Sequence, residues 1–125
     1  PDRAVFAEGG YDLHEPHCFE GRPEDGVCGN PKSIYYPKGL QQQEYPESVC
    51  RAAMIRTKSH KLIRRTSGKH ELYDLTADPE ELHNIYGQTE HLEVGRHLEQ
   101  RLLEWYIETS DVTPWIPDPR GFPEI

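Results

Sequence analysis

Residues 51–86 read RAAMIRTKSHKLIRRTSGKHELYDLTADPEELHNIY and contain three short runs of mixed apolar and polar residues. The runs cover residues 52–57, 60–65 and 70–75, and clusters of Ser, Gly and Lys separate them. Such clusters are typical of turns, and runs of this length rich in Ile, Leu and Tyr predict a meander of antiparallel strands. The second run contains LIRR, which places one apolar and one basic residue on each face, so the buried face stays open at this stage.

The sequence after the third run carries the signals of a helix start. Asp78 is a suitable N-cap, and Pro79 suits the first helical position. Glu80 and Glu81 would be stabilised by the positive end of the helix dipole. We therefore predict a short helix from residue 78, which Gly87 would end. Its apolar residues on one side would be Leu82, Ile85 and Tyr86.

This stretch resembles the closing segment of type I sulfatases, which belong to the alkaline-phosphatase superfamily. In that family an Arg-Thr-x-x-x-Lys-Leu-Ile pattern precedes Glu-Leu-Tyr-Asp-Leu, and Asp-Pro-x-Glu and a nearby Asn follow. The matching residues here are Arg56, Thr57, Lys61, Leu62, Ile63, Glu71 to Leu75, Asp78, Pro79, Glu81 and Asn84. The sequence LLEWYIETSDVTPW at residues 102–115 is also similar to the last helix of bacterial members. Folding alone explains this motif, so it identifies a scaffold and not a chemistry.

The resemblance implies that residues 1–125 are the smaller C-terminal subdomain of a sulfatase. In that family the subdomain packs against a large α/β catalytic domain, which would be N-terminal to this chain and its main partner. Only 34% of the residues are hydrophobic and the mean hydropathy is −0.86, which is little for a self-sufficient core. The first residue is Pro1 rather than Met, so we expect a piece of a longer polypeptide.

The fold class predicted from these elements is α+β, with a small antiparallel sheet of about four strands packed against a C-terminal helix. The first strand is expected at residues 2–8, with Val5 inward, Ala7 as a second inward candidate, and Phe6 on the other face. The Gly-Gly pair that follows should end it. Residues 11–47 would form a long irregular loop that lies on the catalytic domain.

A longer helix is predicted near the C-terminus. It should begin at Gln88 or Thr89 and run to about Ile107 or Thr109. Its apolar stripe would be Leu92, Leu98, Leu102, Trp105 and Tyr106. Gly95 interrupts this helix at a cost of ~1 kcal/mol and would allow a close approach to the sheet.

The candidate substrate contacts are Tyr11, His14 and His17, in the loop GGYDLHEPHC at residues 9–18. Glycine-hinged loops after strands are common places for substrate contacts. The two histidines could bind sulfate oxygens or donate a proton to the leaving alcohol near neutral pH. No family motif fixes these residues, and ordinary loop hydrogen bonds explain them as well.

The same loop allows a different interpretation, a structural zinc site of His14, His17, Cys18 and Cys28. We disfavour it because the adjacent His17 and Cys18 rarely reach one ion and no Cys-x-x-Cys pair is present. A disulfide between Cys18 and Cys28 that leaves Cys50 free, and three reduced thiols, both stay open. The compartment therefore stays open too, either periplasmic or secreted, or cytoplasmic.

By the resemblance, the parent enzyme uses a formylglycine made from the Cys or Ser of a Cys/Ser-x-Pro/Ala-x-Arg motif. It also uses a divalent cation, usually calcium, that acidic pairs of the catalytic domain hold. None of the three cysteines lies in such a motif, and Asp-Asp does not occur in the sequence. We therefore assign no catalytic residue, metal ligand or cofactor to this chain itself.

The predicted function is the C-terminal part of an enzyme that hydrolyses sulfate esters, supporting the fold and lining the rim of the substrate pocket. A homo-oligomer contact is a further option. A phosphonate or phosphate ester hydrolase of the same superfamily is the near alternative, and a stand-alone interaction module is the alternative of a different class. The net charge of −8 argues against binding to nucleic acid or to an anionic membrane. The tail at residues 111–125 holds four prolines and is not expected to form regular structure.

Overall fold

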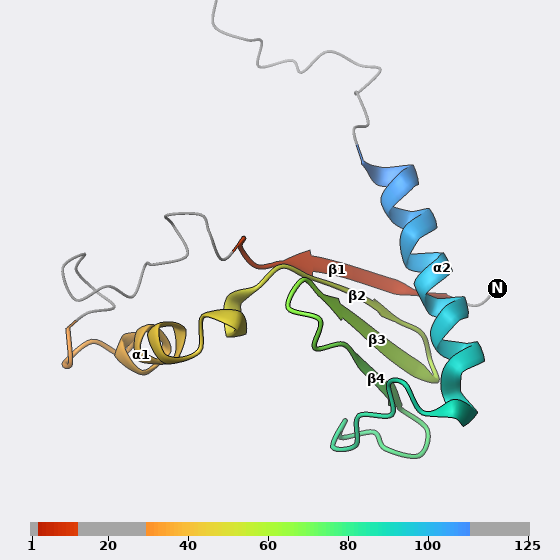
Figure 1. Cartoon of the computed structure of the whole chain (residues 1–125), viewed down its shortest axis with the longest axis horizontal. Coiled ribbons are helices and arrows are strands. Elements are labelled where there is room, and N and C mark those ends of the chain that lie inside the picture. The colour runs from red at the N-terminus through yellow and green to blue at the C-terminus, as the bar shows by residue number, and fades with distance from the viewer. Residues whose placement is uncertain (1–2, 13–29, 111–125) are drawn as a thin grey trace, which may run out of the picture.

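The computed structural model describes residues 3–12 and 30–110. One antiparallel sheet has the strand order β1-β2-β3-β4, and α2 lies across one of its faces (Figure 1). The strands are β1 (Val5–Gly9), β2 (Ala52–Arg56), β3 (His60–Arg65) and β4 (Glu71–Asp74). The helices are α1 (Tyr36–Glu44), α2 (Leu92–Thr109) and two short 3-10 helices, η3 (Pro46–Val49) and η4 (Thr89–His91). The predicted α+β class, the meander and the C-terminal helix are confirmed.

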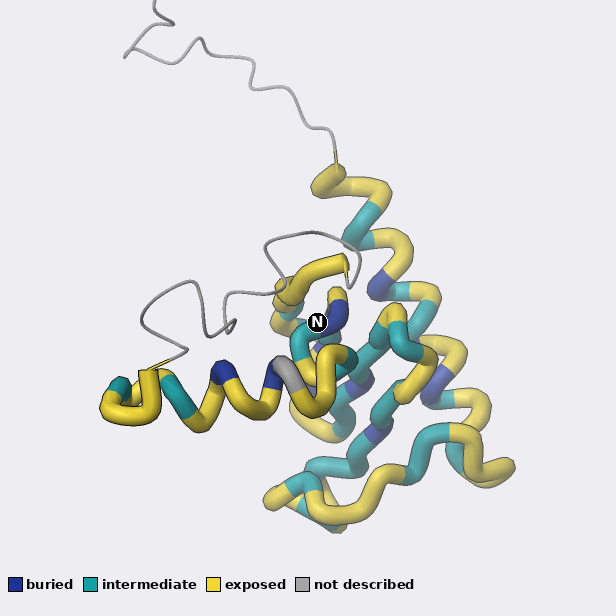
Figure 2. The backbone as a smooth tube through the Cα atoms, turned by 60° about the vertical axis from the view of Figure 1, so that its left-hand side comes forward, coloured by how far each residue is buried: buried dark blue, intermediate teal, exposed yellow. Residues whose placement is uncertain are grey.

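The hydrophobic core lies between α2 and the sheet. Ile55, Leu62 and Leu72 are neighbours across β2, β3 and β4, and all three are almost fully buried. Leu98 and Leu102 of α2 pack on them. Buried positions concentrate where the strands face α2 (Figure 2). Each such aliphatic side chain contributes about 1.5–3 kcal/mol when it leaves water.

This packing decides which face of β3 is buried. Leu62 lies in the core, so Arg64, two residues further on, shares its face, and Ile63 and Arg65 lie on the other. Arg64 is only partly buried, and its Nη1 donates a hydrogen bond to Oε1 of Glu99 in α2 at 2.8 Å.

The prediction for the faces of β1 is wrong. Phe6 lies on the core side and stacks on Trp105, with ring centroids 5.0 Å apart and planes 4° from parallel. Val5 is 58% exposed and Ala7 is also exposed. The register explains the difference, because Phe6 is opposite Ile55, whose side chain is already in the core.

The loop predicted for residues 11–47 is wrong in its last part, because residues 36–44 form α1. Pro37 lies in the first turn, where its missing N–H leaves no hydrogen bond unmade. The helix lies beyond the edge of the sheet, away from α2 (Figure 1), and Ile34 before it is 85% exposed. The part of the loop at residues 13–29 is outside the described residues.

The helix predicted from residue 78 is also wrong, since residues 76–88 form turns. The carboxylate of Asp78 does accept a backbone hydrogen bond, but from the N–H of His83 at 2.7 Å, five residues away. Glu81 has a φ of 59°, in the left-handed region that a helix excludes. Gly87, with a φ of 82°, therefore occupies a turn and does not end a helix.

Asn84 ties this turn segment to the sheet. Its Oδ1 accepts hydrogen bonds from the N–H groups of Leu72 and Tyr86, both at 3.0 Å. Its Nδ2 donates to the carbonyl oxygen of His70 at 3.0 Å. The N–H of Ile85 also donates a backbone hydrogen bond to the Leu72 carbonyl at 2.9 Å. These contacts hold the turn segment against β4.

Two further residues of the quoted motif have equally structural contacts. Oγ1 of Thr57 accepts the N–H of His60 at 3.0 Å and donates to the carbonyl of His60 at 3.2 Å, which closes the β2–β3 turn. Nζ of Lys61 lies 2.5 Å from Oε2 of Glu81. The motif therefore encodes the scaffold, as its spacing indicated.

The predicted bounds of the C-terminal helix are close to those of η4 and α2. Leu98 and Leu102 are buried as predicted, whereas Leu92 is 41% exposed. The contact with the sheet begins one turn later, at the buried Gly95. Neither of the two α-helices in the described ranges is long and apolar enough to cross a membrane. The tail at residues 111–125 lies outside those ranges.

Candidate functional site

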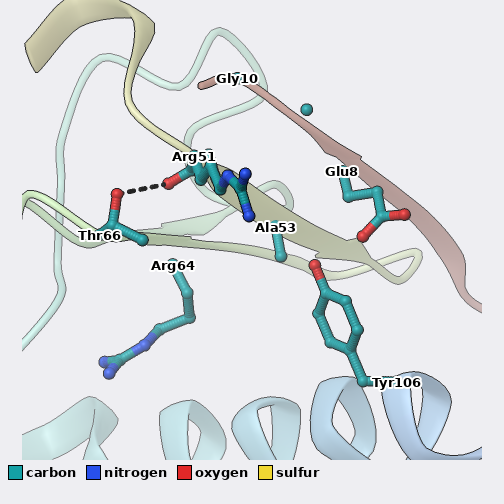
Figure 3. Close-up of a pocket in the computed structure, with 9 residues that line it drawn as sticks. Glu8, Gly10, Arg51, Ala53, Arg64, Thr66 and Tyr106 are labelled. Carbon is teal, nitrogen blue, oxygen red and sulfur yellow. Dashed lines mark hydrogen bonds between the residues drawn. The ribbon is translucent and has the colours of Figure 1, made fainter. Parts of the chain in front are cut away.

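A hollow of about 500 Å³ opens at a corner of the sheet, beside the C-terminal part of α2 (Figure 3). The end of β1, the start of β2, the end of β3 and one residue of α2 line it. We call it the corner hollow, and its lining residues are Glu8, Gly9, Gly10, Arg51, Ala52, Ala53, Arg64, Thr66 and Tyr106.

One wall of the corner hollow is a phenol–carboxylate pair. The hydroxyl of Tyr106 and the carboxylate of Glu8 point toward each other (Figure 3). Burial raises the pKa of Tyr106, and the hydrogen bond that its hydroxyl donates to Glu8 raises it further. The phenol therefore remains a proton-bearing donor, and the carboxylate keeps spare acceptor positions for a ligand.

The opposite wall is cationic. Arg51 lines the hollow across from Glu8 and Tyr106 (Figure 3). The backbone of Arg51 is fixed, because its carbonyl accepts hydrogen bonds from the Thr66 N–H at 3.0 Å and the Thr66 hydroxyl at 3.3 Å. A guanidinium offers several donors in one plane and pairs well with sulfate, phosphate or carboxylate oxygens.

Arg64 is directed away from Arg51 and toward α2 (Figure 3). Its guanidinium lies 5.8 Å from the ring centroid of Tyr86 and donates to both the Tyr86 hydroxyl and Glu99. The Tyr86 hydroxyl also donates to Oε1 of Glu99 at 3.1 Å. Burial, followed by the hydrogen bond to Glu99, raises the pKa of Tyr86. Arg64 therefore ties the end of β3 to α2 beside the hollow.

The floor of the hollow is built by a close backbone approach. Gly10 has a φ of 93°, and a Cβ there would lie 2.3 Å from the carbonyl oxygen of Cys50, so only glycine fits. Tyr11 then crosses to the next segment, where its N–H donates to the Val49 carbonyl at 2.8 Å and its carbonyl accepts from the Arg51 N–H at 3.0 Å. The chain therefore leaves β1 at a fixed point beside the hollow.

Cys50 lies under this crossing and is 3% exposed. Burial raises the pKa of its thiol, but hydrogen bonds from Ser67 and Thr66, together with the charge of Arg65, outweigh that effect. The net pKa is below the ordinary value. The thiol is unpaired, and its burial keeps it from substrate.

The structure places one of the three sequence-predicted contacts. Tyr11 is partly exposed next to the corner hollow. His14 and His17 lie outside the described residues, as do Cys18 and Cys28 of the zinc alternative. Sequence reasoning missed the corner hollow itself. The one sequence signal for it was the Gly-Gly pair at the end of β1. That Arg51 and Tyr106 line the same hollow follows only from the sheet register and the packing of α2.

The lining of the corner hollow does not hold an activated nucleophile. A nucleophile would need a base within hydrogen-bond reach and a third group to orient that base. Among residues 3–12 and 30–110, His60 Nδ1 lies 2.9 Å from Ser59 Oγ, but these are adjacent residues on an exposed turn. Within the same ranges no cluster of three His, Cys, Asp or Glu side chains could hold a metal ion.

The architecture defines the class of protein as a two-layer α+β subdomain whose motif residues serve the scaffold. Residues 30–108 match the protein family described as N-sulphoglucosamine sulphohydrolase, C-terminal. The chain therefore belongs to this family of sulfatase C-terminal subdomains, within the alkaline-phosphatase superfamily. The family resemblance given by the quoted motif is confirmed.

The chain is similar to known proteins and solved structures. An N-acetylglucosamine-6-O-sulfatase from Bacteroides thetaiotaomicron is 37% identical over 87 residues, which are 66% of this chain and 15% of that protein. A solved structure of a protein in complex with its substrate D-glucosamine-2-N,6-O-disulfate has 37% identity and a TM-score of 0.47, and the match covers 53% of this chain and 14% of that one. The phosphonate monoester hydrolase of Agrobacterium radiobacter has 21% identity and a TM-score of 0.53, with 84% and 17% covered. This last likeness concerns the fold alone.

Proposed function

We propose that the chain is the non-catalytic C-terminal part of an enzyme that hydrolyses sulfate esters. The observation that carries this proposal is the family match over residues 30–108, and the 37% identity to an N-acetylglucosamine-6-O-sulfatase supports it. The chain spans only 15% of the length of that relative. The activity would therefore belong to a longer polypeptide in which this subdomain supports the fold.

The second role that we propose is a contribution to the rim of the substrate pocket. The corner hollow supports it, because Arg51 offers donors to sulfate oxygens, and Glu8 offers acceptors to hydroxyl groups. Tyr11 lies at this same corner, and His14 and His17 follow it in the sequence. We keep these three residues as proposed substrate contacts.

The nucleophile and the metal ion of the parent enzyme would come from the portion that precedes this chain. The cysteines here do not lie in a formylglycine motif, and the described residues lack a cluster that suits a divalent cation. The donor set of this chain does not fit either group. A formylglycine and a calcium-type cation remain proposals for the parent enzyme.

The choice between ester classes can be tested on the polypeptide that includes the preceding region. We expect it to hydrolyse an aryl sulfate with a higher kcat/KM than an aryl phosphonate monoester. The phosphonate monoester hydrolase with the same fold makes the second substrate the proper comparison. A kcat/KM that favours the phosphonate would transfer the chain to that branch of the superfamily, and inactivity toward both esters would favour the interaction module.

A further inference from the structure

The hairpin of β3 and β4 is closed by a side chain. The pairing of the two strands ends at Ile63 and Glu71, although β3 itself continues to Arg65. Beyond that point the N–H of Arg65 donates a hydrogen bond to Nδ1 of His70 at 3.2 Å. A ring nitrogen here does what a carbonyl oxygen does within the ladder. The backbone bonds from Gly68 N–H to the Arg65 carbonyl and from His70 N–H to the Gly68 carbonyl, both at 3.1 Å, complete the turn.

This β3–β4 turn, residues 66–69, covers the segment that leads into β2. The N–H and the hydroxyl of Thr66 both donate to the carbonyl of Arg51 (Figure 3). Hydrogen bonds from Ser67 and Thr66 reach the thiol of Cys50, which is 3% exposed. The turn therefore encloses the thiol and fixes the backbone of Arg51 beside the corner hollow.

The surroundings of the His70 ring favour its neutral form. The ring packs edge-on against Tyr86 of the turn segment, with centroids 5.2 Å apart. The charged groups that act on it are Arg64 of β3 and Glu99 of α2. Burial lowers the pKa of His70, the charge of Arg64 lowers it further, and Glu99 acts in the opposite direction. Glu99 already accepts hydrogen bonds from Arg64 and Tyr86, which reduces what it can do for an imidazolium.

Protonation of His70 removes the acceptor that closes the turn. A protonated imidazole carries a hydrogen on each nitrogen, so Nδ1 and the N–H of Arg65 would face each other as two donors. We propose that His70 is a pH-sensitive latch, which holds the β3–β4 turn over Cys50 and Arg51 while the ring is neutral and releases the turn when the ring gains a proton. Histidine is the side chain that normally changes its charge between about pH 5 and 8, where such a latch would act.

The proposed opening is local. The buried cluster between the sheet and α2 does not include residues 66–69, and local openings cost less free energy than unfolding of the whole domain. Arg51 and Thr66 both line the corner hollow. We therefore expect the released turn to loosen that wall and to uncover the Cys50 thiol. The latch does not depend on which ester the parent enzyme hydrolyses.

Hydrogen exchange followed by mass spectrometry tests the latch in the intact polypeptide. The protection factor, which is the intrinsic exchange rate divided by the measured rate at the same pH, is determined for residues 65–70. The open turn binds a proton more readily than the closed turn, so acid favours opening. We expect this protection to fall by about three- to tenfold from pH about 7.5 to about 5.5, because an open-state pKa near 6.5 limits the change to about tenfold.

Two variants assign the change to His70. His70→Asn places an amide oxygen near the position of Nδ1, so the acceptor is present at every pH and protection should stay nearly constant. His97→Asn is the matched control, because His97 is exposed on α2, and it should behave like the unvaried protein. Circular dichroism reports whether each variant folds. If His70→Asn does not fold, His70→Gln replaces it, with protection expected to be low and independent of pH.

Low concentrations of urea separate the local opening from unfolding. Unfolding exposes much surface and is promoted by urea, whereas a local opening exposes little. We therefore expect urea to accelerate exchange in α2 and to leave exchange at residues 65–70 nearly unchanged. Equal acceleration in both segments would overturn the latch. So would constant protection of residues 65–70 in the unvaried protein, or an undiminished fall of that protection in His70→Asn.

The Cys50 thiol provides a second readout. Labelling with 4,4′-dithiodipyridine, a disulfide that reacts with thiols in acid as well as at neutral pH, is followed by mass mapping of the peptide that contains Cys50. The rate relative to that of free cysteine at the same pH should rise in acid by the same factor as the loss of protection, and it should stay low in His70→Asn. A relative rate that does not change with pH would contradict the opening over Cys50.

Discussion

His70 shows how single residues of this fold hold segments together. Its Nδ1 accepts the N–H of Arg65 at 3.2 Å, and its carbonyl accepts the side-chain amide of Asn84. The imidazole ring packs edge-on against Tyr86, with centroids 5.2 Å apart. Asn84 is a residue of the family motif, but its contacts with β4 could not be predicted from the sequence. The role of His70 needed the hairpin geometry.

The hydrogen bond to Nδ1 requires a neutral ring, and this makes stability depend on pH. Burial, and then the charge of Arg64, lower the pKa of His70 below 6.5, with Glu99 acting in the opposite direction. The unfolded chain therefore binds more protons than the folded chain between the folded pKa and 6.5. This contribution is complete above 6.5 and is lost as the pH falls through the folded pKa.

We predict that the free energy of unfolding, measured with urea, decreases between pH about 7.5 and about 5.5, and that His70→Gln reduces this decrease. His97→Gln is the matched control, because His97 is exposed on α2. If the unvaried chain and His70→Gln lost stability equally as the pH falls, the hydrogen bond from Arg65 to His70 would not contribute to the pH dependence. A second loss is expected as the pH falls from 4.5, where Glu71 of the unfolded chain takes up a proton, through the lower pKa of the folded chain, because hydrogen bonds from Tyr73 and Arg65 outweigh burial and lower that pKa.

At the scale of elements, the meander and the long helix were predictable and the segments between them were not. The three runs at residues 52–75 have the length and composition of strands, and the Ser, Gly and Lys clusters between them predict the turns. The Asp78 segment has every local signal of a helix start, but Asn84 and Ile85 bind to Leu72 of β4 instead. These tertiary hydrogen bonds hold residues 76–88 in turns in place of the predicted helix. The polar helix α1 is the reverse case, a helix that forms where a loop was predicted. Its sequence lacks the apolar stripe that would predict a helix.

Gly95 and Gly10 differ in the space around them, and this difference gives a prediction at the scale of elements. A Cβ at Gly95 of α2 would lie 3.7 Å from Cδ2 of Leu72, an ordinary contact distance. We predict that Gly95→Ala raises the free energy of unfolding by about 1 kcal/mol, because alanine favours a helix more than glycine does. Gly10→Ala is the contrasting control and should destabilise strongly, since its Cβ would meet the Cys50 carbonyl. Destabilisation by Gly95→Ala in urea unfolding would mean that α2 packs on β4 more tightly than described.

At the scale of the whole molecule, the candidate site was only partly accessible from the sequence. Tyr11 could be named because it follows the Gly-Gly pair. The corner hollow joins Glu8, Arg51 and Tyr106, which are far apart in the chain and meet only through the strand register and the crossing of α2. The faces of β1 depend on the same register, and they are the feature of this strand that the alternation pattern misassigned.

The measurement that tests the central claim most directly is aryl sulfate turnover by the 125-residue chain alone and by the same chain joined to, or mixed with, its preceding region. The account predicts turnover only when the preceding region is present, because the cysteines of this chain do not lie in a formylglycine motif and no cluster among the described residues could hold a metal ion. Turnover by the 125 residues alone would contradict the claim and would direct attention to His14, His17 and their loop.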